Sequence, residues 1–176
     1  MFETLITNKT RIKLLIRFFL NSEKTAYLRG LEREFGNSSN AIRLELKRFE
    51  EAGLLMSEAT GNRKEYRVNT SYPLYDEIQS MVLKHFGIDT IIVNVIERLG
   101  DLKSVYLTGE LAKGMDSKLI DIALVADKMD RVFLGSLVEK AEKQIKRKIR
   151  TYVVTSNQAD TIPEPKVLIF GEDQKH

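Results

Sequence analysis

The chain of 176 residues contains no cysteine, only two histidines and no long apolar run. Without cysteine it can form no disulfide, no thiolate metal site and no cysteine nucleophile. No apolar run reaches the ~18 residues that a membrane-crossing helix needs. The first residues also lack the charged, apolar and small-residue order of a secretory signal. We therefore expect a cytoplasmic protein without a membrane partner.

The net charge of +3 at neutral pH is unevenly distributed along the chain. Residues 1–70 hold 13 lysines and arginines against 9 acidic residues, whereas residues 71–176 hold 15 against 16. The basic excess therefore lies in the N-terminal part, where it would favour contact with phosphate groups.

Two helices are predicted in the first forty residues. Over residues 12–20 the apolar side chains recur at helical spacing, and a two-turn helix fits residues 28–35. The segment 25–28 reads as a short extended piece or as the start of the second helix. Gly36 follows this helix in the position of a C-terminal cap, where we expect a positive φ.

A third helix is predicted over residues 38–49, capped by one of the two serines at its start. Ile42, Leu46 and Phe49 share one of its faces and should pack inward. The opposite face then carries Asn40, Arg43, Leu44 and Lys47. On an ordinary charged helix such a face is only solvated, but the short helix before it and the hairpin after it favour a recognition helix.

The hairpin is predicted from two short strands, 54–58 and 65–69, that flank a glycine-containing loop. Arg63 and Lys64 lie at its expected tip. The order of helix, tight turn, helix and hairpin is typical of a winged helix. In that fold one helix enters the DNA major groove, and the wing contacts the DNA backbone.

The predicted recognition helix carries side chains suited to both bases and phosphates. Arg43 and Asn40 suit base edges, because arginine pairs with guanine and asparagine with adenine. Lys47 and Arg48 are expected to contact phosphates, which position a protein without reading sequence. The expected DNA-binding residues are Ser38, Ser39, Asn40, Arg43, Lys47, Arg48, Arg63 and Lys64.

A polar break with a proline, 69–73, precedes two predicted helices, 74–86 and 88–99. Their apolar positions could pack against the first domain or join a second subunit. The pattern then changes to buried strands with one long helix, 129–146. The strands are predicted over 104–108, 119–126, 149–154 and 166–170. We predict an α+β fold with a winged-helix domain (1–70), a helical linker or dimerisation region (71–100) and a small α/β domain (101–176).

Two resemblances follow from these residues. Residues 10–70 resemble an ArsR-type winged-helix transcription regulator. Residues 100–155 resemble a small nucleotidyltransferase domain of the DNA polymerase β type, which has a Gly-Ser and Ala-Arg-Gly turn, an Asp-x-Asp strand and a third acid on a later strand. The matching residues here are Gly109-Glu110, Ala112-Lys113-Gly114 and Asp121. The fused arrangement is similar to bacterial regulators that join the two modules.

The departures from the nucleotidyltransferase pattern bear on chemistry. Two carboxylates on one strand face hold Mg²⁺ against a triphosphate, but the neighbours of Asp121 at that spacing are Leu119 and Ala123. Glu110 replaces the phosphate-holding serine, and the third strand offers Arg150, Thr151 and Tyr152 in place of an acid. Asp116 is a weak substitute for a second ligand. We expect an inactive domain, with Asp121 hydrogen-bonded to the 109–114 turn.

The same residues leave a second use open, in the binding of a small ligand or cation. The expected pocket consists of Gly109, Glu110, Lys113, Gly114 and Asp121. Metal sensing of the ArsR kind is disfavoured, because such regulators use cysteine and histidine clusters and this chain has only His85 and His176. No metal and no cofactor are expected.

The sequence thus favours a DNA-binding transcriptional regulator, not an enzyme, that forms a homodimer on double-stranded DNA. Its second domain would serve dimerisation, partner binding or effector sensing. The alternative is an active nucleotidyltransferase that carries a winged-helix targeting module. A winged helix that contacts only protein is a third option, against which the basic excess argues.

Overall fold

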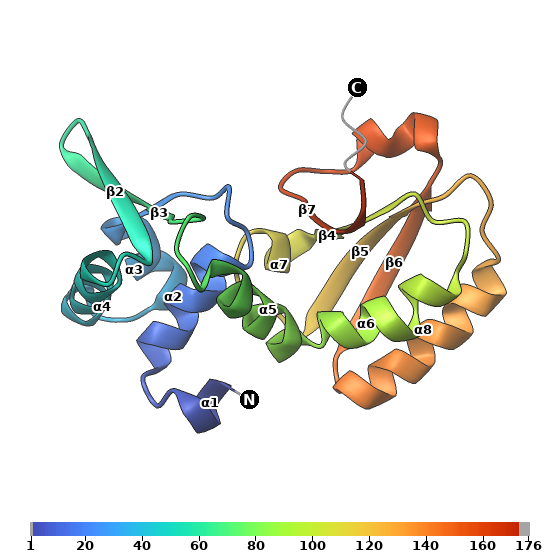
Figure 1. Cartoon of the computed structure of the whole chain (residues 1–176), viewed down its shortest axis with the longest axis horizontal. Coiled ribbons are helices and arrows are strands. Elements are labelled where there is room, and N and C mark those ends of the chain that lie inside the picture. Colours follow the sequence, from blue (N-terminus) through green and yellow to red (C-terminus); the bar gives the residue numbers. More distant parts are fainter. Residues whose placement is uncertain (1, 173–176) are drawn as a thin grey trace. The chain divides into compact units, whose positions relative to one another are not determined.

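A computed structural model describes residues 2–172, and the chain divides between His85 and Phe86 into two compact units (Figure 1). The first unit contains a three-stranded sheet and the second a four-stranded sheet. The protein is therefore α+β, as the sequence predicts. The three-part division at residues 70 and 100 stays a prediction. Within residues 2–172 no helix is long and apolar enough to cross a membrane.

The first unit is built mainly from helices whose positions follow the sequence pattern. They are α1 (Phe2–Leu5), α2 (Lys9–Phe19), α3 (Leu28–Phe35), α4 (Ser39–Glu51) and α5 (Tyr75–Phe86). The short strand β1 (Ala26–Tyr27) leads directly into α3, so the segment before α3 is extended. Gly36 ends α3 with a φ of 63°, which confirms the expected cap.

The hairpin consists of β2 (Leu55–Thr60) and β3 (Arg63–Val68), and it extends away from the helices of its unit (Figure 1). β3 lies between β1 and β2, antiparallel to both. Gly61 and Asn62 form the turn, with Gly61 at a φ of 60°. Because the turn is this short, Arg63 and Lys64 begin β3 and pair with Thr60 and Ala59, whereas the sequence placed them in the loop.

The core of the first unit joins side chains from all its longer helices and from the hairpin. Phe18 and Phe19 of α2 are fully buried, together with residues from the neighbouring elements. These are Leu31, Ile42, Leu46, Leu55 and Val82. The inward face predicted for residues 38–49 is confirmed, and it fixes which side of α4 faces solvent.

The second unit contains a sheet in the order β6-β5-β4-β7. Its strands are β4 (Ser104–Thr108), β5 (Leu119–Val125), β6 (Lys148–Val154) and β7 (Val167–Gly171). β5 and β6 are parallel and are joined through α8 (Arg131–Ile145), while β4 is antiparallel to both of its neighbours. The predicted strands and the long helix are thus confirmed, with small changes at their ends.

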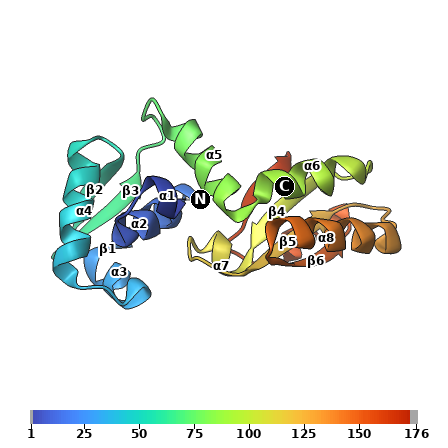
Figure 2. The same cartoon turned by 90° about the horizontal axis from the view of Figure 1, so that it is seen from below.

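Helix α6 (Ile88–Asn94) is shorter than the sequence predicts. After Val95 the chain continues as the 3-10 turn η1 (Ile96–Arg98), so the expected helix over 88–99 is wrong beyond residue 94. The run of β-branched residues around this point disfavours a continuous helix. Asn94 donates a hydrogen bond to Gln144 of α8, and the two views show α6 beside α8 (Figure 2).

One face of this sheet is covered by the segment that follows β6. Ala159 of the 3-10 helix η2 (Ser156–Thr161) and Ile162 pack with Tyr106, Ala123 and Val125. Residues 109–114, expected as a turn, begin with the single-turn helix α7 (Gly109–Ala112). This face of the sheet also carries Asp121, because side chains alternate along β5.

Candidate nucleic-acid interface

Helix α4 presents the outward face that the sequence predicts. Asn40, Arg43, Leu44 and Lys47 are all exposed, whereas Ile42 and Leu46 are buried. Arg43 makes no hydrogen bond or ion pair with the described residues. Its guanidinium group is therefore available to a ligand from outside the chain.

Two serines fix the start of α4. The Ser38 hydroxyl accepts a hydrogen bond from the Ala41 backbone N–H at 3.4 Å, so Ser38 is the N-cap. The Ser39 hydroxyl donates to the Glu32 carboxylate of α3. Ser38 therefore fixes where α4 begins, and Ser39 ties that end of α4 to α3.

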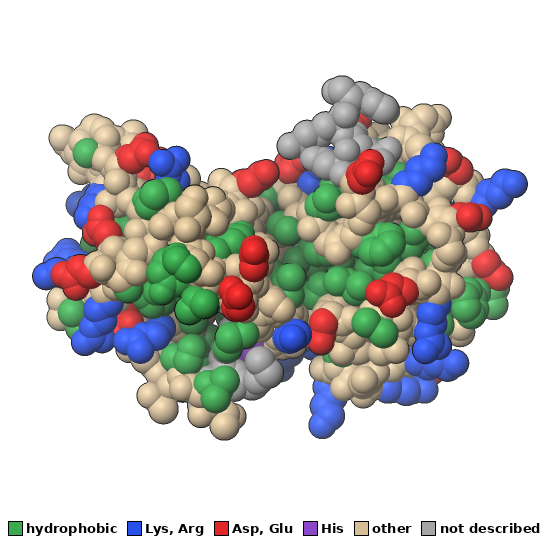
Figure 3. All heavy atoms as spheres, viewed as in Figure 1, with side chains coloured by type: hydrophobic (Ala, Val, Ile, Leu, Met, Phe, Trp, Pro, Cys, Tyr) green, Lys and Arg blue, Asp and Glu red, His purple; other side chains and the backbone are tan. Residues whose placement is uncertain are grey.

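A hollow of about 490 Å³ lies between the start of α3, the side of α4 and the hairpin. Four of its side chains are cationic and none is acidic. The cationic residues are Arg29, Arg43, Arg63 and Lys64, and the remainder are Tyr27, Leu28, Leu46, Asn62 and Tyr66. Such a concave basic surface attracts phosphate groups. Figure 3 shows lysine and arginine side chains along the α3–α4 side of this unit.

The two wing cations are held differently. The Arg63 guanidinium lies 5.0 Å from the ring centroid of Tyr27, a cation–π contact that leaves its N–H donors open. Lys64 Nζ lies 2.7 Å from the Glu50 carboxylate and 5.3 Å from the Tyr66 ring centroid. The hydrogen bond that Lys64 donates to the Glu50 carboxylate raises the pKa of Lys64 above its usual value. Of the two, Arg63 has more of its charge available for phosphates.

The remaining predicted cations do not all join this surface. Lys47 is exposed and lies 3.6 Å from Glu51, one turn along α4. Arg48 lies 2.5 Å from the buried Glu45 and lines a separate, largely apolar cavity. The structure therefore brings Arg43, Arg63 and Lys64 together and places Arg48 elsewhere; its role in DNA contact stays a prediction.

Sequence reasoning missed several residues of this region. Tyr27, Arg29 and Asn62 line the basic hollow, although no helical or strand pattern in the sequence links them. Glu45 is the more informative omission, because its side chain is only 2% exposed despite its charge. Its position three residues after Ile42 and one before Leu46, both inward-facing, was the available signal.

In the second unit, Asp121 has a cationic partner on the neighbouring strand. Its carboxylate lies 2.5 Å from Arg150 Nε, and the two residues are in register across β5 and β6. The hydrogen bond to Asp121 raises the pKa of Arg150. The sequence did not predict this partner, which stands on the strand that would carry the third acid. The predicted bond between Asp121 and the 109–114 turn stays a prediction.

The other residues of the pocket expected around Asp121 form separate contacts. Gly109 lies directly against the Asp121 side chain, because a Cβ added at Gly109 would lie 2.3 Å from the Asp121 carboxylate. Glu110 lies 2.7 Å from Lys113 in an exposed ion pair. Asp116 lies 3.5 Å from Arg147, in a contact separate from Asp121. Within residues 2–172 no group of three or more acidic or histidine side chains is placed to hold a metal ion.

Comparisons with known proteins give only distant structural similarity. No family model and no curated protein sequence matches the chain. A mutant of the toxin–antitoxin MntA-HpeT is similar at a TM-score of 0.42 and 18% identity, over 50% of this chain and 75% of that one. A toxin–antitoxin crystal structure with AMP-PNP gives the same TM-score and identity, over 50% and 76%. Reduced HlyU from Vibrio cholerae N16961 gives a TM-score of 0.35 at 14% identity, over 51% and 80%.

Proposed function

We propose that the first unit is a winged helix that binds double-stranded DNA, and that the protein is a transcriptional regulator. One observation carries the proposal: the exposed face of α4 borders a hollow with four cationic and no acidic side chains. An α-helix fits the major groove, while a basic hairpin beside it can reach the phosphate backbone. Arg43 would read a base edge, and Arg63 would position the hairpin.

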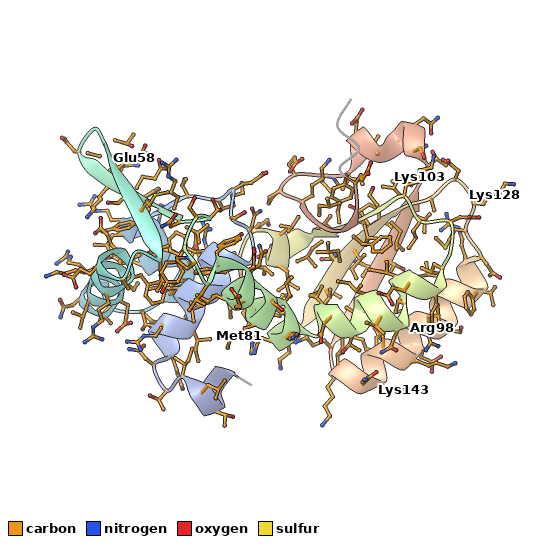
Figure 4. All side chains as sticks on the ribbon, viewed as in Figure 1. Glu58, Met81, Arg98, Lys103, Lys128 and Lys143 are labelled. Atoms are coloured by element: carbon orange, nitrogen blue, oxygen red, sulfur yellow. The ribbon has the colours of Figure 1, made fainter. Side chains whose placement is uncertain are left out.

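The test is selection of binding sites from randomised duplex DNA by the full-length protein. We expect enrichment of a short motif, because Asn40 and Arg43 offer base-specific hydrogen bonds. The control is Arg98→Ala, an exposed arginine of the second unit (Figure 4), which should select the same motif as the unaltered protein. Selection without any enriched motif would contradict sequence-specific binding.

We further propose that the second unit transfers no nucleotides. Support comes from Asp121, whose carboxylate is neutralised by Arg150 at 2.5 Å, and from the apolar residues at the neighbouring positions of β5. A two-metal site needs additional carboxylates to clamp both phosphate oxygens. The exposed Glu110 would also repel a triphosphate at the turn.

This proposal is tested by incubating the protein with labelled nucleoside triphosphates, Mg²⁺ or Mn²⁺, and nucleic-acid or protein acceptors. The expected result is no labelled product above that of an Asp121→Ala variant. Labelling that disappears in this variant would show that the domain is an enzyme. Nucleotide binding without transfer would instead fit a sensor role.

A homodimer completes the proposed function. Leu74, before α5, and Val93 of α6 are 53% and 54% exposed, although both are large apolar residues. Both residues lie in or beside the two helices that the sequence marks as candidate dimer surface, and homodimer interfaces are rich in apolar area. A two-fold dimer would offer two copies of α4 to half-sites about 34 Å apart on one DNA face.

A further inference from the structure

A second cavity of the first unit lies on the opposite side of α4 from the basic hollow. Its volume is about 390 Å³, within the range of about 300–1,000 Å³ for small-molecule sites. Its walls are apolar and come from α2, α4 and α5, with Leu15, Phe49, Ile78 and Met81 among them. Figure 3 shows hydrophobic side chains exposed over α2 and α5, and Figure 4 marks Met81 on α5.

Among the described residues, two arginines form the only charged part of this wall. Arg11 and Arg48 both line the cavity, and both bind the buried carboxylate of Glu45. Arg11 Nε lies 2.8 Å from one Glu45 oxygen, and Arg48 Nη1 lies 2.5 Å from the other. Two guanidinium groups therefore share one carboxylate, which leaves one positive charge beside an apolar chamber.

The arginines also keep hydrogen-bond donors beyond those that Glu45 uses. Arg11 Nη1 and Arg48 Nε and Nη2 donate to no acceptor among the described side chains and backbone atoms. A planar guanidinium group with open donors binds a carboxylate or a similar anion well. The cavity thus offers an apolar wall and an anion-binding rim in one place.

We propose that this cavity binds a small amphipathic monoanion, with its apolar body against Phe49 and Met81 and its anionic head on Arg11 and Arg48. The two arginines and Glu45 together carry one positive charge, which a single negative charge on the ligand would balance. A cationic head would be repelled by the arginines, and a second negative charge would be repelled by Glu45. The ligand would contact the back of α4, whose front carries Arg43, so it is a candidate effector for DNA binding.

The probe is octanoate, titrated calorimetrically into the full-length protein without DNA. We expect saturable binding of one octanoate per chain. Octanol should bind at least about tenfold more weakly, because its neutral hydroxyl forms weaker hydrogen bonds with the arginines than a carboxylate does. Octyltrimethylammonium should not bind. Equal binding of octanoate and octanol, or no octanoate binding, would overturn the proposal.

Two pairs of variants locate the site. Arg48→Gln should weaken octanoate binding at least about tenfold, whereas Arg67→Gln should not, although Arg48 and Arg67 are 51% and 50% exposed and each pairs with a glutamate. Met81→Glu should abolish binding, and Met56→Glu, an exposed methionine of the hairpin, should not. Unchanged octanoate affinity in Arg48→Gln or Met81→Glu would contradict the assignment.

A second copy of the chain is the competing occupant. Sedimentation of the same variants separates the two cases. If Met81→Glu converts a dimer to a monomer and octanoate does not bind to either form, the cavity is a subunit contact and the ligand proposal is wrong. Because octanoate binding is measured without DNA, its failure would leave the proposed DNA binding intact, and failure of DNA binding would leave the octanoate result standing.

Discussion

At the scale of single residues, Glu45 shows how a buried charge can organise a helix. Its carboxylate accepts hydrogen bonds from Asn8, Arg11 and Arg48, so all of its charge is compensated within the unit. Burial raises the pKa of Glu45, but the hydrogen bonds from Arg11 and Arg48 outweigh burial, and the net pKa lies below its usual value. A buried charge of this kind is stabilising only while its partners remain.

The first prediction concerns Glu45→Gln. We expect the free energy of unfolding at neutral pH to fall by about 1–3 kcal/mol, the range for a hydrogen-bonding group left with unsuited partners. A depressed folded-state pKa stabilises the protein above the unfolded-state pKa, and that contribution is lost as pH falls. The unaltered protein should therefore lose more stability than Glu45→Gln as pH falls below about 4.5.

Urea unfolding at a series of pH values measures both effects. Glu58→Gln is the control, because Glu58 pairs with Arg67 at the surface and such pairs contribute little. Equal acid sensitivity of Glu45→Gln and the unaltered protein would show that Glu45 does not carry this contribution.

At the scale of elements, two glycines of the second unit differ in whether their position in the structure requires glycine. Gly109 joins β4 to α7 at a φ of 67°, with the Asp121 carboxylate where a Cβ would stand. Gly135 lies within α8, where a Cβ would meet nothing within 4 Å. The two positions therefore call for opposite outcomes of the same substitution.

We expect Gly109→Ala to destabilise the protein by at least about 1–2 kcal/mol, because it adds left-handed strain and a clash. Gly135→Ala should stabilise it by up to about 1 kcal/mol, because alanine favours a helix interior more than glycine does. Thermal unfolding of the two variants provides the measurement. A stable Gly109→Ala variant would contradict the close approach of Gly109 to the Asp121 carboxylate.

The elements were largely predictable because their signals are local. Apolar spacing located α4 and its buried face, and runs of β-branched residues located β4 and β5. The end of α6 at Asn94 was missed, since helical spacing continued past the point where the backbone changed. Asp121 paired with Arg150 was also missed, because strand register joins residues far apart in sequence and no pattern along one strand specifies it.

The candidate site was predictable in part for the same reason. The exposed side of α4 follows from helical periodicity, so Arg43 and its neighbours could be named from the sequence. The addition of Arg29 and Asn62 to the basic hollow depends on how α3 and the hairpin pack around α4. Arg48 faces the Glu45 side because it lies about 140° around α4 from Arg43, at the ~100° per residue of an α-helix.

At the scale of the whole molecule, we predict a dimer whose contact includes Leu74 or Val93. Leu74→Lys or Val93→Lys should shift the protein toward the monomer, because a charge would be buried at the contact. Val132→Lys is the control, because it makes the same change at an exposed position of α8, outside the helices α5 and α6 for which the contact is proposed. Sedimentation at tens of micromolar gives the masses; a chain that sediments as a 20.2 kDa monomer, with or without DNA, would contradict the dimer.

The central claim is that Arg43 reads bases and Arg63 holds the backbone, and one titration tests it most directly. The affinities of the unaltered protein, Arg43→Ala and Arg63→Ala are measured for the selected site and for a scrambled duplex at several salt concentrations. Arg43→Ala should lose about 1–3 kcal/mol on the selected site only. Arg63→Ala should weaken binding to both duplexes alike and lower the salt slope by about one. If both variants bind the selected site as tightly as the unaltered protein does, α4 and the hairpin are not the DNA-binding surface.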